Sequence, residues 1–380
     1  MFKYYFSCIA LFIIFVVIGG MALATDTSEK ASVVAVGDNL IHPVVYNDAQ
    51  RQDGSFDFTP MYQHIKKDIQ QPDLAFVNQE SPLGGDDRPF SGFKQFNTPS
   101  RIAHDVVNTG FDIVNAANNH VLDQGDEGVH NNIQTWNHYK DKALFTGVFD
   151  SEKEAQGIHT ITSKGIKVSV LSYTYGTNDM TSKYPYTVKT FDEQTIKHDV
   201  RKAKKESDIV MVSAHWGNEN HLQPNKTQQK YAQLFADEGV DVVIGTHPHV
   251  IQPIEWVKSQ TSDHKTLVAY SLGNFLNGQY GGNENNQLLG RINFDVVKTP
   301  KDAHVEHVTW TSMVNHYEQA NPYNKNTRQN FCIYNLDDYN EQLAQKHGLR
   351  YDPQSEWNVH HLQDVTKQVI DGQFLNEKSM

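Results

Sequence analysis

The chain has 380 residues, 38% of them hydrophobic and 11% aromatic, which is enough to bury a core in one large or two ordinary domains. Its 33 basic and 45 acidic residues give a formal net charge of −12. This balance argues against nucleic-acid binding through a broad basic face, because such binding depends on Lys and Arg contacts with phosphates. An anionic ligand would need a local cationic pocket or a metal ion.

The first predicted element is a membrane-directed segment at residues 1–24. It contains an almost unbroken apolar run from Tyr4 to Ala24, close to the ~20 residues that cross a hydrocarbon core. The ending Ala22-Leu23-Ala24 also fits a cleavage site, but the run exceeds the usual signal core of ~7–15 residues. We therefore expect an uncleaved anchor in the cell membrane, with secretion after signal cleavage as the alternative. Residues 25–30 are a spacer, and the bulk of the protein is expected on the extracytoplasmic face.

Strand-like runs alternate with helical segments from residue 31 onward, which is typical of an α/β fold. Apolar runs at about 158–172 and 265–310 have little helix between them and predict antiparallel strands, so the sheets should be mixed. We expect residues 31–320 to form one domain and residues 321–380 to be a C-terminal appendage that wraps or caps it. The expected helices cover residues 98–109, 126–139, 191–206, 226–238 and 363–370.

Side chains that can bind metals or transfer protons follow five of the strand-like runs directly. In open α/β sheets, ligands gather beyond the carboxyl ends of the strands, so these side chains suggest one shared site. Imidazole is the commonest protein ligand for metals of the manganese, zinc and iron class. In chain order the residues are Asp38, Glu80, Asn119 with His120, His215 with Glu219, and His247 with His249.

Each of these motifs also has a purely structural interpretation. An extended His247-Pro248-His249 segment would put both imidazoles on one side of the chain just past a strand, but the two could also be polar loop residues. Asp38 could be a turn residue or a helix N-cap. Glu80 could be a structural carboxylate that pairs with an arginine.

His120 is a candidate general acid, because Asp123 three residues later could orient its imidazole. The alternative is an Asn-rich turn at Asn118-Asn119. Glu80 and Asp38 could also act as acid and base if no metal binds.

Four further residues are candidates for substrate binding. Trp216 could be a platform for the substrate or part of the core, and the sequence favours neither. Glu219 adds a carboxylate near His215. Lys94 and Arg101 lie between Glu80 and Asn119 and could supply a cationic patch, although a solvated loop is the simpler explanation.

Together the motifs resemble the CapA family of poly-γ-glutamate capsule biosynthesis proteins, which is related to the calcineurin-like metallophosphoesterases. The resemblance covers about Ala31 to Asn277 and includes SLGNFL at Ser271–Leu276. It implies a four-layer α/β/β/α sandwich of two mixed sheets. The motifs that carry it are GDN at Asp38, NQE at Glu80, NNH at His120, HWGNE at His215 and GTHPH at His247.

The resemblance also implies a ligand set for one or two divalent ions of the manganese, zinc or iron class. In the phosphoesterases, two metals ~3.5–4 Å apart clamp the phosphoryl group and activate the attacking water. By motif, Asp38, Glu80 and His249 would hold the first metal, with Glu80 bridging to a second held by Asn119, His215 and His247. His120 would then protonate the leaving oxygen.

This chain departs from the phosphoesterase pattern in two places. The phosphoesterase motif Asp-x-His has Leu40 at its third position here, with His42 as the nearest imidazole, and Glu80 replaces the usual bridging aspartate. A site with two ions, one ion or no metal is therefore open.

The resemblance implies a membrane-anchored protein that serves the synthesis, anchoring or export of an anionic polymer such as poly-γ-glutamate, together with membrane synthase subunits. One alternative is a metal-dependent hydrolase of a phosphoester or of an amide in the polymer or cell wall. Another is a polymer-binding module without turnover. Nucleic acid is not an expected partner.

Overall fold

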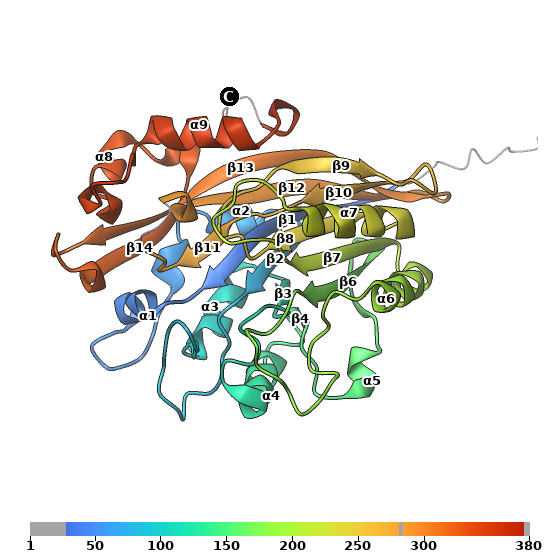
Figure 1. Ribbon diagram of the computed structural model, residues 1–380, viewed down its shortest axis with the longest axis horizontal. Helices are drawn as coiled ribbons and strands as arrows, with labels where there is room; N and C mark the ends of the chain where they lie inside the picture. Colours follow the sequence, from blue (N-terminus) through green and yellow to red (C-terminus); the bar gives the residue numbers. More distant parts are fainter. Residues whose placement is uncertain (1–27, 281–283, 376–380) are drawn as a thin grey trace, which may run out of the picture.

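The computed structural model describes residues 28–280 and 284–375, and these form two stacked sheets flanked by helices (Figure 1). Both sheets are mixed. In spatial order, the first sheet consists of β14 (Arg328–Asn335), β13 (Ala303–Gln319), β12 (Leu288–Lys298), β1 (Glu29–Leu40), β2 (Leu74–Gln79), β3 (Ile113–Asn115) and β4 (Leu144–Thr146), with β11 (Asn274–Asn277) beside β1. The second consists of β5 (His159–Ser163), β6 (Ile166–Thr174), β7 (Ile209–His215), β8 (Val242–Thr246), β10 (Lys265–Ala269) and β9 (Ile254–Lys258).

The parallel strands of each sheet lie side by side. In the first sheet β1, β2, β3 and β4 are parallel, while β12, β13 and β14 continue the sheet in antiparallel fashion. In the second, β6, β7, β8 and β10 are parallel, and β5 and β9 are antiparallel edges. The antiparallel expectation for residues 265–310 is thus correct for β12 with β13 and for β10 with β9. It does not hold between β10 and β8, which are parallel because the chain first runs back through β9 and then turns into β10.

Alternation along β7 shows where the two cores lie. Ile209 and Met211 belong to the main core between the sheets, whereas Val210 and Val212 face a second core beneath two helices. Those helices are α6 (Glu193–Glu206) and α7 (Lys226–Glu238), which cover the outer face of the second sheet (Figure 1).

The bounds of α7 match the predicted helix 226–238 because both ends carry local signals. Asn225 and Gln228 form a capping box at the start. Gly239 ends the helix with a φ of 82°, the left-handed conformation that glycine adopts readily.

Most of the remaining helices pack on or around the first sheet, and α5 faces α6 across a cavity. Apolar residues of α2, α3 and α9 join the main core, and α9 lies along β13 (Figure 1). The expected four-layer α/β/β/α sandwich is therefore confirmed. These helices are α1 (Pro43–Ala49), α2 (Lys66–Gln70), α3 (Arg101–Thr109), α4 (Gly125–Asn137), α5 (Glu152–Ala155), α8 (Glu341–Ala344) and α9 (Val359–Val369), and the 3-10 turns are η1 (Thr59–Tyr62), η2 (Glu284–Gln287), η3 (Lys325–Thr327), η4 (Leu336–Asp338), η5 (Gly348–Tyr351) and η6 (Gly372–Phe374).

The segment predicted as a C-terminal appendage contributes to the first sheet. Its strand β14 pairs with β13, and three apolar residues of α9, Leu362, Val365 and Val369, belong to the main core. The hydroxyl oxygens of Ser312 in β13 and Thr366 in α9 lie 2.8 Å apart. Strand β14 and helix α9 are therefore packed as integral parts of the fold.

Within residues 28–280 and 284–375, no helix is both long and apolar enough to cross a membrane. The segment 1–24 that the sequence predicts as an anchor lies outside the described residues.

Candidate functional site

The two sheets bring the predicted metal ligands together beyond the carboxyl ends of their parallel strands. All six side chains are buried, with at most 5% of any residue exposed. The first sheet supplies Asp38 near the end of β1, Glu80 after β2 and Asn119 after β3, and the second supplies His215 at the end of β7 and His247 and His249 after β8.

Asp38, Glu80 and His249 form what we call the first ligand group. Their ligand-capable atoms all lie within 4.8 Å of one another. Nε2 of His249 is 3.6 Å from Oε1 of Glu80, and Nδ1 is 3.3 Å from Oδ2 of Asp38. Nδ1 also lies 3.0 Å from the amide oxygen of Asn274. An Nδ1–H that donates to Asn274 leaves the Nε2 lone pair facing Glu80, as a metal ligand requires.

Glu80, His215 and His247 form the core of the second ligand group, again with their ligand-capable atoms within 4.8 Å of one another. Asn119 completes it, because its Oδ1 lies 2.9 Å from Nε2 of His215. Nδ1 of His215 is 2.9 Å from the Thr246 hydroxyl, so it can donate there while Nε2 faces Glu80 at 3.8 Å. Glu80 belongs to both groups.

A chain of side-chain amides fixes Asp38. Asn115 donates to the Asn78 amide oxygen at 2.7 Å, and Asn78 donates to Oδ1 of Asp38 at 2.7 Å. The backbone N–H of His247 donates to Oδ2 at 3.0 Å. Asp38 is thereby tied to β2, β3 and the loop after β8, so strands of both sheets determine its position.

Gly37 permits this arrangement because β1 runs against the backbone at Gly273. A Cβ atom at position 37 would lie 1.9 Å from the carbonyl oxygen of Gly273, a distance that no side chain tolerates. The next residue, Asp38, donates its backbone N–H to that same oxygen at 3.0 Å. Only glycine can therefore occupy position 37 at this contact.

The loop after β8 holds its two histidines in unusual backbone conformations. His247 has a φ of 93° and His249 a φ of 57°, so the prediction of an extended His-x-His segment is wrong. Both rings nevertheless enter the cluster, with centroids 5.8 Å apart. Such strained non-glycine residues persist where surrounding contacts fix them, and they concentrate at ligand sites.

Glu80 is a fully buried carboxylate that belongs to both ligand groups. Neither of its oxygens has a hydrogen-bond partner among the described residues, and the same holds for Nδ1 of His247. Burial, followed by the Asp38 carboxylate, raises the pKa of Glu80 well above its usual value. Burying an ionised carboxylate without hydrogen-bond partners costs on the order of several kcal/mol of folding free energy. A divalent cation among these atoms would remove that cost, so the donor set fits a metal.

The histidines differ in their titration. Burial, aided by the neighbouring imidazoles, lowers the pKa of His215 and of His247 well below the usual value. Burial acts in the same direction on His249, but the carboxylates of Glu80 and Asp38 outweigh it and raise the pKa to about 9. His249 therefore carries a proton at neutral pH when no metal is bound.

His120 faces the cluster with its Nε2 atom, 4.0 Å from Oε1 of Glu80. Its Nδ1 lies 2.8 Å from Oδ2 of Asp123, which also accepts the backbone N–H of Phe96 at 2.7 Å. The ring of Phe96 packs edge-on against the imidazole. These contacts fix the ring and leave Nε2 available to a substrate, the geometry expected of a general acid with an orienting carboxylate.

A cleft of about 920 Å³ leads to the cluster. Asn119 and Asp123 lie at its base, and Lys94, Asp179 and Glu219 contribute charges to its walls. Phe93, 72% exposed, and Met180 give the cleft an apolar rim. Lys94 and Glu219, two of the residues predicted to contact the substrate, therefore line this cleft.

Two predicted substrate contacts lie elsewhere. Trp216 is 1% exposed in the second core, where its indole N–H donates to the Tyr270 carbonyl oxygen at 2.9 Å. Arg101 pairs with Asp105 on its own helix at 3.0 Å, and it is not part of the cleft wall. Trp216 is held by packing under α7, and Arg101 is held by an i,i+4 ion pair. The prediction that these two residues contact the substrate is therefore corrected.

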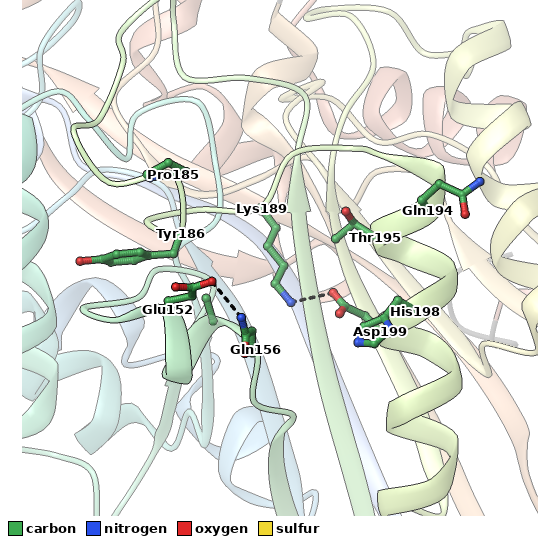
Figure 2. Close-up of a pocket in the computed structure, with 10 residues that line it drawn as sticks. Glu152, Gln156, Pro185, Tyr186, Lys189, Gln194, Thr195, His198 and Asp199 are labelled. Carbon is green, nitrogen blue, oxygen red and sulfur yellow. Dashed lines mark hydrogen bonds and ion pairs between the residues drawn. The ribbon is translucent and has the colours of Figure 1, made fainter.

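Another cavity, of about 620 Å³, lies between α5, α6 and the loop at 185–189 (Figure 2). Its buried ion pair is Lys189 with Asp199, 2.6 Å apart, and Tyr173 also donates to Asp199. Lys189 and Asp199 therefore neutralise each other, and Glu152 at the same cavity accepts a hydrogen bond from Gln156. None of the predicted site residues lines it, so the polar cluster remains the candidate for chemistry.

The family comparison agrees with this geometry. Residues 32–279 match the family model described as "Bacterial capsule synthesis protein PGA_cap". The chain belongs to this family. The matched range contains every member of both ligand groups, together with His120 and Asp123.

Two curated relatives carry names from capsule synthesis. The "Capsule biosynthesis protein CapA" of Bacillus anthracis is 25% identical over 265 residues, which are 66% of this chain and 60% of the relative. The "PGA biosynthesis protein CapA" of Bacillus subtilis (strain 168) is 27% identical over 220 residues, which are 57% of this chain and 56% of the relative. The chain thus spans less than two thirds of either relative.

Solved structures include a more distant likeness. The calcineurin-like phosphoesterase YfkN from Bacillus subtilis aligns with a TM-score of 0.44 at 14% identity, covering 90% of this chain and 100% of that one.

Sequence reasoning missed the residues that hold the ligands in place. Thr246 and Asn274 orient His215 and His249, and Asn178 accepts the Asn119 amide N–H at 3.2 Å, which turns Oδ1 of Asn119 toward His215. Tyr175 was also missed, and its ring lies 4.6 Å from that of His247. Thr246 and Asn274 stand inside quoted motifs, but Asn178 and Tyr175 belong to a loop with no motif of its own.

Proposed function

We propose that this protein is a divalent-metal-dependent hydrolase that serves the synthesis, anchoring or export of an anionic capsule polymer of the poly-γ-glutamate type. The observation that carries the proposal is that Glu80 belongs to both ligand groups. Its buried oxygens lack hydrogen-bond partners among the described residues and face imidazoles from both sheets. Membership of the capsule synthesis family supports the cellular role.

The chain's own residues would divide the chemistry as follows. Asp38, Glu80 and His249 would hold one ion, and Glu80, Asn119, His215 and His247 the other. Bound divalent ions would supply Lewis-acid polarisation of the scissile group and neutralise its developing charge. His120 would donate a proton from Nε2 to the leaving group, with Asp123 positioning the ring.

The charges of the cleft disfavour a metal-free polymer-binding module. Of the charged residues that line it, Lys94 is basic, whereas Asp123, Asp179 and Glu219 are acidic. An anionic polymer would meet net repulsion there unless bound cations reversed the local charge. We therefore favour chemistry at a metal site over passive binding.

Hydrolysis of two chromogenic substrates tests the reaction. The full-length chain, purified in mild detergent and loaded with Mn²⁺, would be given bis(p-nitrophenyl) phosphate and γ-glutamyl-p-nitroanilide. We expect turnover of one of them, loss of that turnover in His215→Asn, and retention in Asp179→Asn, which removes a carboxylate that belongs to neither ligand group. A fully loaded protein that turns over neither substrate contradicts the hydrolase and leaves the capsule role to be tested separately.

The capsule role is tested in cells. A strain that lacks this gene should regain surface polymer with the wild-type chain and not with Glu80→Gln at equal protein levels. Full restoration by Glu80→Gln would separate the capsule role from the metal site.

The same proposal includes location on the extracytoplasmic face of the cell membrane, with residues 1–24 as an anchor. Its support is the apolar run from Tyr4 to Ala24. We expect the protein to stay in the membrane pellet after alkaline carbonate washing and to be digested by protease added to spheroplasts. Release of a shortened chain into the medium would favour the cleaved signal peptide instead.

A further inference from the structure

The turn after β7 places a third carboxylate beside the two ligand groups. Glu219 has a carboxylate oxygen within 4.8 Å of ring nitrogens of both His247 and His249. Its side chain is exposed, whereas those two imidazoles are buried. Glu219 therefore approaches the cluster from the solvent side.

The approach is fixed by the backbone around it. Gly217 has a φ of 91° and Asn220 a φ of 64°, so the chain turns sharply on both sides of Glu219. The N–H of Asn220 donates to the Pro248 carbonyl oxygen at 2.8 Å. Asn286 donates both to the Asn220 side chain, at 2.9 Å, and to the His249 carbonyl oxygen, at 3.1 Å. The turn is thus bonded directly to the segment that carries the two histidines.

The two ligand groups are unequal without Glu219. The second offers four side chains, Glu80, Asn119, His215 and His247, and the first offers three. His42, the imidazole nearest to Asp38 in the sequence, does not fill the difference. Its Nδ1 lies 3.0 Å from the Leu40 carbonyl oxygen and 3.2 Å from the Gly278 nitrogen, and His42 is in none of the metal-capable groups of the described residues.

We propose that Glu219 is the outer ligand of the first metal position, completing the set of Asp38, Glu80 and His249 from the solvent side. This inference rests on the proposed metal-dependent function. An exposed glutamate keeps its rotamer freedom, so it can release the ion when a substrate group takes its place. The first position would then be the open one, at which substrate exchanges with a protein ligand, and the second would be closed by buried ligands.

Metal stoichiometry and magnetic coupling test the assignment without an activity readout. Full-length protein in detergent, stripped with chelator, would be titrated with Mn²⁺ by calorimetry and examined by electron paramagnetic resonance. Wild type should bind two ions and give the spectrum of a coupled Mn²⁺ pair. Glu219→Gln should bind one ion with unchanged affinity and the other at least ~10-fold more weakly, with an uncoupled spectrum at one equivalent.

Two further variants locate the effect. Asp179→Asn removes an exposed carboxylate from the same cleft and should bind both ions as wild type does. Asp38→Asn should lose the first ion, and Asp38→Asn/Glu219→Gln should match Asp38→Asn alone because both changes act on one position. Glu219 is exposed, so its substitution leaves the core packing intact.

The possible results distinguish a failure of the Glu219 assignment from a failure of the proposed metal-dependent function. Wild-type binding of both ions by Glu219→Gln overturns the assignment and leaves the metal site standing. A double variant that binds no ion also overturns it, since Glu219 would then serve the second position. A wild-type protein that binds no Mn²⁺ overturns both the assignment and the proposed function.

Discussion

The first and second ligand groups share Glu80, but their histidines differ in protonation. In the second group, burial keeps the pKa of His215 and His247 well below the usual value, so both imidazoles are neutral at pH 7. In the first group, two carboxylates override burial and raise the pKa of His249 to about 9. A metal therefore finds the two imidazoles of the second group already neutral, but it must displace a proton from His249 in the first.

The difference follows from the side chains that make up each group. The first group combines one imidazole with two carboxylates, whereas the second combines two imidazoles with an amide oxygen and the shared carboxylate. Oxygen-rich sets suit Mn²⁺, and imidazole-rich sets suit Zn²⁺ and Fe²⁺. One carboxylate can therefore bridge two positions with different metal preferences and different pH dependence.

The largest expected effect comes from the residue that the groups share. Glu80→Gln removes the bridging carboxylate, so both ions should be lost or bound more than ~100-fold more weakly. Elemental analysis after purification without chelator measures this directly, with Asp179→Asn as the control. Two ions retained by Glu80→Gln would contradict the bridging role.

The same variant has a consequence for the metal-free protein. Because burial raises the pKa of Glu80 above 4.5, the folded state binds the proton more tightly than the unfolded state does, and stability falls as pH rises above 4.5. Gln cannot ionise, so metal-free Glu80→Gln should lose less stability than metal-free wild type between pH 4 and pH 8. Denaturant unfolding in the presence of chelator measures the stability of both proteins. An equal dependence of stability on pH would contradict the claim that Glu80 ionises at a cost in the metal-free fold.

The pH dependence of metal binding should distinguish the two groups. Since His249 holds a proton up to about pH 9, the affinity of the first position should rise ~10-fold for each pH unit between 6 and 8. The second position should change less, because its imidazoles are already neutral there. Calorimetric titrations in buffers of different ionisation enthalpy count the protons released on metal binding. If the metal affinities of the two positions changed equally with pH, the proposed difference between the groups would be wrong.

A smaller effect is expected from the charge behind His120. Asp123→Asn keeps an oxygen that can accept from both His120 and the Phe96 backbone, so it removes the charge while preserving the contacts. Turnover should fall ~10-fold to 100-fold with both ions still bound. Loss of metal in Asp123→Asn would assign this residue to the ligand shell instead.

The smallest effects separate the two basic residues that the sequence grouped together. Lys94 lines the cleft, so Lys94→Ala should raise the KM for an anionic substrate a few-fold. Arg101→Ala should leave KM unchanged and lower stability by ~1 kcal/mol, because the buried Asp105 loses a partner. If Arg101→Ala raised the KM as much as Lys94→Ala does, the prediction that both residues form one cationic patch would be supported after all.

The sequence was most informative where local pattern and final position coincide. Asp38, Glu80 and His215 stand directly after apolar strand runs, so their meeting at the strand ends followed from α/β topology. Helix α7 could be predicted to the residue because its capping box and its terminal glycine are local signals. The direction of β10 could not, since it depends on pairing with β8 rather than on its own residues.

The sequence could not predict side-chain environments that depend on packing between residues far apart in the chain. Trp216 follows a ligand directly, but its contacts with α7 and Tyr270 place it in the core. Asn178 orients Asn119 from 59 residues away, and no pattern in its own loop announces that role. The positive φ angles of His247 and His249 likewise arise from bonds to Asp38 and neighbouring turns, which no dipeptide pattern reveals.

The central claim is that strand ends from both sheets build a two-ion site bridged by Glu80. The most direct measurement is anomalous X-ray scattering at the manganese absorption edge from crystals grown with Mn²⁺. We predict two peaks, one bounded by Asp38, Glu80 and His249 and one by Glu80, His215 and His247. No anomalous peak within this cluster, in crystals that show the six side chains in place, would contradict the account.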